Sequence, residues 1–115
     1  MEIKGSSVEE SARLVRTLAD SIVALGGWVL SQGINGSGVI IMLFEFERQK
    51  CADIYCTLIG AGVELNLNEH AHLTALCQCT NGRQMECGKE IASIELEVQT
   101  FPARAARQAP TSQAA

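Results

Sequence analysis

Two histidines and two glutamates are the side chains of this sequence that are best suited to acid–base chemistry or to metal binding. His70 and His72 are two residues apart, so an extended segment would place both imidazoles on one face. If that segment pairs with the last predicted strand, Glu95 or Glu97 can lie across from Thr74 or His72 on the same face. Two imidazoles and a carboxylate can hold a divalent metal or transfer a proton. The competing interpretation, which the pattern favours, is a solvated polar sheet face with a weak cross-strand ion pair.

The cysteines form a second group with possible chemistry. Cys77 and Cys79, with Cys87 nearby, could share a soft metal ion. However, the first two have the same alternation parity as Leu73 and Ala75, so the pattern places them in the core as small apolar side chains. A zinc site needs four ligands, and the sequence has no Cys-x-x-Cys pair. We therefore predict no metal and no cofactor, and we interpret the five cysteines as reduced thiols.

The glycine-rich segment 33–38 could in principle cradle a phosphate with its backbone amides. It lacks the Lys-Ser/Thr ending of a P-loop, and it lies between two predicted strands instead of before a helix. A hairpin turn around Asn35-Gly36 is the better interpretation. The sequence also has no Gly-x-Ser-x-Gly elbow, so we predict no catalytic nucleophile.

Composition limits the classes of partner. The chain has 115 residues, 47% of them hydrophobic, which suits one globular domain. The net charge is −4 and the basic residues are scattered, which argues against nucleic acid and against a polybasic membrane contact. The longest apolar run, Val39–Phe44, is too short to span a bilayer. Because no signal-peptide pattern follows Met1, we expect a cytoplasmic protein.

Two helices are predicted. The first begins with capping-box spacing between Ser7 and Glu10 and ends at Gly26-Gly27. The second extends from Arg48 to about Gly60. In both, apolar residues recur at helical spacing, which indicates one buried face.

Four strands are predicted: Trp28–Ser31, Val39–Glu47, His70–Thr80 and Ile91–Phe101. The third rests on a long alternation of apolar and polar residues that starts at Val63. In the second strand, Val39, Ile41 and Leu43 add an apolar face opposite the one that faces the helices. A sheet with one exposed side would carry polar residues there. We therefore expect something other than the two helices to cover these three side chains.

The predicted fold is α+β, with two helices on one face of a four-stranded antiparallel sheet in the order α-β-β-α-β-β. Residues 1–101 form the single domain, and residues 102–115 form a disordered tail without large apolar side chains. The segment 7–67, with its Gly-Gly-Trp-Val-Leu-Ser-Gln-Gly-Ile stretch and the helix that ends Leu-Ile-Gly-Ala-Gly-Val-Glu-Leu, resembles the middle of an ACT domain. More broadly, it is similar to ferredoxin-like α+β sandwiches. An ACT domain begins with a strand that is not predicted here, so no effector-binding residues are carried over.

The sequence favours a non-enzymatic module that dimerises through its sheet, at Val39, Ile41 and Leu43, and that can bind a small molecule at the interface. One alternative is a small enzyme or metal-binding protein that uses His70, His72 and a cross-strand carboxylate. Another alternative is a structural adaptor whose tail engages a partner.

Overall fold

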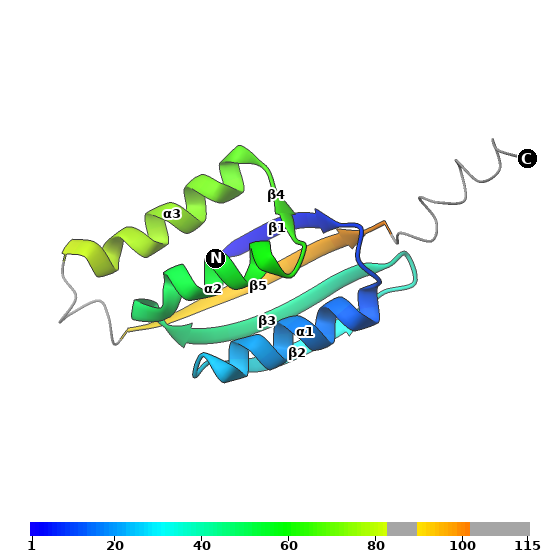
Figure 1. Cartoon of the computed structure of the whole chain (residues 1–115), viewed down its shortest axis with the longest axis horizontal. Coiled ribbons are helices and arrows are strands. Elements are labelled where there is room, and N and C mark those ends of the chain that lie inside the picture. Colours follow the sequence, from blue (N-terminus) through cyan, green and yellow to red (C-terminus); the bar gives the residue numbers. More distant parts are fainter. Residues whose placement is uncertain (83–89, 102–115) are drawn as a thin grey trace, which may run out of the picture.

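The computed structural model describes residues 1–82 and 90–101. Within these residues the chain is an α+β structure with three α-helices and a five-stranded mixed sheet (Figure 1). The elements are β1 (Glu2–Ser7), α1 (Ser11–Ala24), β2 (Trp28–Ile34), β3 (Val39–Glu47), a 3₁₀ turn η1 (Arg48–Lys50), α2 (Cys51–Gly60), β4 (Glu64–Leu65), α3 (Leu67–Gly82) and β5 (Ile91–Thr100).

The strand order in the sheet is β2-β3-β5-β1-β4. β5 therefore lies in the middle, antiparallel to β3 and parallel to β1. Helices α1 and α2 lie over one face of the sheet, and α3 lies beside α2 at the β1 side (Figure 1). The opposite face, which is called the outer face below, is not covered by any helix in the described residues.

The core lies between the helices and the inner face of the sheet. Alternate residues of β3 and β5 are fully buried there, among them Phe44 and Leu96, and Ile3 contributes from β1. They pack against Leu14 and Leu18 of α1 and against further buried side chains of α2 and α3. The buried side chains, which alternate along the strands, thus pack against the apolar side chains on one face of each helix.

The predicted helices and three of the predicted strands are present. Val39–Glu47 is β3 with the predicted bounds, the helix from Arg48 to Gly60 is η1 together with α2, and Ile91–Thr100 is β5. The first strand of the hairpin is longer than predicted and reaches Ile34. Its turn is held by the Asn35 side chain, which accepts hydrogen bonds from the amides of Ser37 and Val39.

The start of α1 differs by one turn from the prediction. Glu10 is the N-cap, and its carboxylate accepts hydrogen bonds from the amides of Ala12 and Arg13. Ser7 instead ends β1, and its hydroxyl accepts a hydrogen bond from the amide of Glu9. The end of α1 is as predicted, with Gly26 at a φ of +89°, in the left-handed region that glycine adopts without strain.

The predicted strand His70–Thr80 is wrong, because this segment belongs to helix α3. Its buried or half-buried side chains, Leu73, Leu76 and Cys77, are spaced three and four residues apart and contact the core. Asn66 precedes the helix and accepts a hydrogen bond from the Glu69 amide, which is the geometry of an N-cap. The alternation of apolar and polar residues in this segment therefore does not correspond to a strand.

The four-stranded antiparallel sheet with two helices is corrected accordingly. The strands that were not predicted are the two-residue β4 and the longer β1, which has only one large buried side chain, Ile3. β1 pairs in parallel with β5, and this pairing makes the sheet mixed. The predicted disordered tail 102–115 and Cys87 lie outside the described residues, as does the side chain of Cys79.

Candidate functional site

The outer face of the sheet collects the side chains that the helices do not cover. On β3 and β5, which form its centre, these side chains alternate with the core residues. Pairing between the strands aligns them in rows across the sheet. The face consists of Trp28, Ser31 and Gly33 from β2, Val39, Ile41, Leu43, Glu45 and Glu47 from β3, Ile91, Ser93, Glu95, Glu97 and Gln99 from β5, and Glu2, Lys4 and Ser6 from β1.

An aliphatic strip extends along β3 on this face, between β2 and β5. It consists of Val39, Ile41 and Leu43, the residues for which the sequence predicted a cover. Ile41 is 43% exposed, while Val39 and Leu43 are half-buried by their neighbours in the sheet. The apolar second face of this strand is thus present, and its most exposed member is Ile41.

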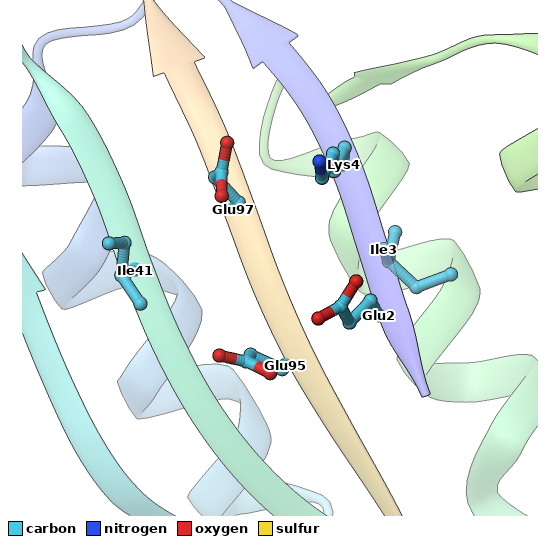
Figure 2. Close-up of a pocket in the computed structure, with 6 residues that line it drawn as sticks. All are labelled: Glu2, Ile3, Lys4, Ile41, Glu95 and Glu97. Carbon is cyan, nitrogen blue, oxygen red and sulfur yellow. The ribbon is translucent and has the colours of Figure 1, made fainter.

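A small hollow lies next to this strip, between β3, β5 and β1 (Figure 2). Its volume is about 120 Å³, and Ile41 forms its apolar side. Glu95 and Glu97 project into it from β5, and Glu2 and Lys4 from β1. In the sheet register, Glu95 lies directly beside Glu2, and Glu97 lies beside Lys4.

This arrangement has a clear electrostatic character. Three carboxylates and one ammonium group share one small region, and neighbouring like charges such as Glu2 and Glu95 destabilise each other. A cationic group in the hollow would relieve this repulsion. Its volume is below the 300–1,000 Å³ that is typical of small-molecule sites. The hollow alone could therefore enclose only a few atoms of a ligand.

The predicted group of His70, His72 and a cross-strand carboxylate does not exist, because His70 and His72 belong to α3 and not to a strand. Glu95 and Glu97 lie on the outer face, while α3 packs against α2, η1 and the β1 edge. The two pairs of residues are thus in different parts of the fold.

Each histidine has its own partner in the helical layer. His70 Nδ1 shares a hydrogen bond with the Tyr55 hydroxyl of α2, and the ring centroids are 5.6 Å apart. His72 Nδ1 lies 3.3 Å from Glu69 Oε2, one turn earlier in the same helix. The His70 contact joins α3 to α2, and the His72 contact stays within α3. Both contacts favour a structural role for the two imidazoles.

Sequence reasoning missed Glu2 and Lys4, because β1 was not predicted. The signal was slight: only Ile3 marks the buried side of a strand whose other inward residues are Gly5 and Ser7. Gly5 is required at that place, since a Cβ atom would come within 2.8 Å of the Glu64 carbonyl oxygen. A strand with so little apolar surface gives almost no hydropathy pattern.

In the described part of the chain, no group of three or more His, Cys, Asp or Glu side chains has a geometry that could hold a metal ion. None of the helices there combines the length and apolar character that a membrane crossing needs. No protein-family model matches the chain, and neither a curated protein nor a solved structure is significantly similar to it. The resemblance to ACT and ferredoxin-like domains therefore stays a prediction.

Proposed function

We propose that this chain is a non-enzymatic module that forms a homodimer through the outer face of its sheet. The observation that carries the proposal is the aliphatic strip of Val39, Ile41 and Leu43 on a sheet face that no helix of residues 1–82 covers. Two sheets that pack face to face can bury such a strip between them, at the usual separation of about 10 Å. Symmetric pairs are the commonest oligomers of identical chains.

The charges of the outer face restrict how two copies can pack. The carboxylates of Glu95 and Glu97 follow the strip on its β5 side. On its β2 side the face presents Ser31 and Gly33, which are uncharged. A symmetric dimer that stacked β5 on the partner's β5 would bring four carboxylates together, and such like-charge contacts oppose association.

A two-fold axis along β3 avoids this repulsion. This axis stacks β3 on the partner's β3 and reverses the lateral order of the strands, so that β5 of each copy lies over β2 of the other. The strand register determines which residues face each other across the dimer, because Gly33, Ile41 and Glu97 form one row across β2, β3 and β5. Glu97 of one copy then faces Gly33 of the other, where the absence of a side chain leaves space.

We further propose that the hollow next to Ile41 is the place for a small ligand at this interface. In the dimer described above, the partner's β2 would approach the hollow and enclose it further. Three carboxylates and one ammonium group around an apolar wall leave an excess of negative charge, which suits a ligand with a positively charged group. Native mass spectrometry of protein purified without additives tests this part, since a dimer that carries an additional small mass supports it and a bare dimer does not.

Light scattering at tens of micromolar tests the dimer itself. The expected mass is about twice the chain mass of 12.3 kDa. Ile41→Lys should convert the protein to a monomer, because a buried lysine would replace the centre of the strip. Ile59→Lys is a matched control, since Ile59 of α2 has the same 43% exposure but lies in the helical layer. A monomeric wild-type protein, or an Ile59→Lys variant that dissociates as readily as Ile41→Lys, contradicts the proposal.

A further inference from the structure

Two thiols from different helices meet below the surface of the molecule. Cys51 is the first residue of α2 and is fully buried, and Cys77 lies half-buried on α3. The Cys51 Sγ lies 3.9 Å from the carbonyl oxygen of Leu73. Cys77 follows one helical turn after Leu73, on the same side of α3, and its side chain is in hydrogen-bonding contact with Cys51.

The two sulfur atoms have different environments. Burial raises the pKa of the Cys51 thiol, and the contact with Cys77 raises it further, against a smaller opposite effect of Arg48. Cys51 is therefore protonated at neutral pH and reacts only slowly with a peroxide in solution. Cys77 is the more accessible of the two, so an oxidant from solution reaches it first.

We propose that Cys51 and Cys77 are a redox-sensitive pair that closes to an intramolecular disulfide when the protein meets a peroxide. In the first step the Cys77 thiol is oxidised by hydrogen peroxide to a sulfenic acid, and one water is released. In the second step the Cys51 sulfur attacks the Cys77 sulfur, and the sulfenic hydroxyl leaves with the Cys51 proton as a second water. Overall, two thiols and one peroxide give one disulfide and two waters.

The bond would fix α3 to the start of α2. In the reduced protein this contact depends on the burial of Leu73 and on a hydrogen bond from Arg48 to the Leu76 carbonyl oxygen. A covalent link over the chain between Cys51 and Cys77 restricts the unfolded state and therefore stabilises the folded one. The proposal is independent of the dimer, because both thiols lie on the helical side of the sheet.

The test is oxidation of the reduced 115-residue chain with hydrogen peroxide, with the intact mass measured before alkylation and the peptides mapped after it. We expect the intact mass to fall by about 2 Da, as two hydrogen atoms are lost, and the peptides of Cys51 and Cys77 to be joined. The melting temperature of the oxidised protein should rise by roughly 5 °C or more. Closure should not depend on protein concentration.

Two variants control the assignment. Cys77→Ser should abolish the 2 Da loss, while Cys56→Ser should retain it, because Cys56 is exposed on α2 and has no part in the pair. Mapping of the wild-type protein decides the question even if Cys77→Ser folds poorly. An unchanged mass, a link that uses another cysteine, or a doubly oxidised Cys77 beside an alkylated Cys51 would each overturn the proposal.

Discussion

The backbone amide of Lys4 in β1 donates a hydrogen bond of 2.7 Å to the Oε1 atom of Glu69 in α3. β4 is only two residues long and pairs with Gly5 and Ser6, so the rest of this sheet edge has little strand pairing. Glu69 is 8% exposed, and its carboxylate accepts the hydrogen bond that the carbonyl group of a neighbouring strand would accept in a longer pairing. A side chain of α3 thus completes the edge of β1, and open edges of this kind are otherwise sites of unwanted pairing.

Glu69→Ala should destabilise the fold, because it leaves the Lys4 amide without the acceptor of its part-buried hydrogen bond. We expect a loss of about 1–3 kcal/mol in the free energy of unfolding. Urea denaturation followed by circular dichroism measures it. His72→Ala is the control, since it removes the exposed partner of the same carboxylate and should cost less than about 1 kcal/mol. Equal losses for the two variants would mean that the Lys4 contact contributes nothing specific.

Leu73→Ala tests whether the segment 67–82 is a helix that packs on the core. Leu73 is fully buried, whereas Leu67 at the start of the same helix is 86% exposed. Truncation of Leu73 should cost about 2–5 kcal/mol, and truncation of Leu67 should change stability by less than about 0.5 kcal/mol. Thermal unfolding of both variants measures the difference. A large loss for Leu67→Ala would show that this end of α3 is packed differently.

The central part of the fold could be predicted from the sequence because its patterns are strong. β3 has a continuous apolar run, and β5 has a clean alternation in which Ile94, Leu96 and Val98 are buried. Both strands agree with the structure, because a strand that packs one face against the helices buries every second side chain. The outward direction of Ile41, Glu95 and Glu97 followed from the same alternation, so these members of the candidate site were placed correctly on their strands.

The error at α3 arose because two periodicities coincide in its sequence. Leu73 and Cys77 fit a spacing of four as well as a spacing of two. The deciding signal was local: Asn66 and Glu69 have the spacing of an N-cap and a third helical residue. Pairing of β1 with β5 depends on residues more than ninety positions apart, and no local pattern reports such a contact.

Two glycines should respond oppositely to alanine. At Gly27, between α1 and β2, a Cβ atom would come within 2.7 Å of the Glu45 carbonyl oxygen, so Gly27→Ala forces this connection away from β3. We expect a loss of about 1–3 kcal/mol from this overpacking. At Gly60, the last residue of α2, nothing lies within 4 Å, and alanine should stabilise by about 0.4–1 kcal/mol. Chemical denaturation of the two variants gives both values, and a stabilised Gly27→Ala variant would contradict the close approach.

The proposed orientation of the dimer makes a charge-specific prediction. Gly33→Lys should strengthen the dimer, because the new ammonium group would face the partner's Glu97 in the row through Ile41. A Cβ atom at Gly33 meets nothing within 4 Å and its φ is not positive, so the substitution is sterically acceptable. We expect the dissociation constant to fall by about tenfold, or ~1.4 kcal/mol, at low ionic strength.

Gly36→Lys is the matched control for this measurement. Gly36 also has nothing within 4 Å, and it lies in the turn between β2 and β3, so the same net charge is added away from the row. Sedimentation equilibrium at several salt concentrations compares the two variants with the wild type. If the wild type dimerises but both lysines act alike, the axis along β3 is wrong while the outer-face dimer stands. If Gly33→Lys alone tightens the dimer and salt removes the gain, the partner's Glu97 is the group that it meets.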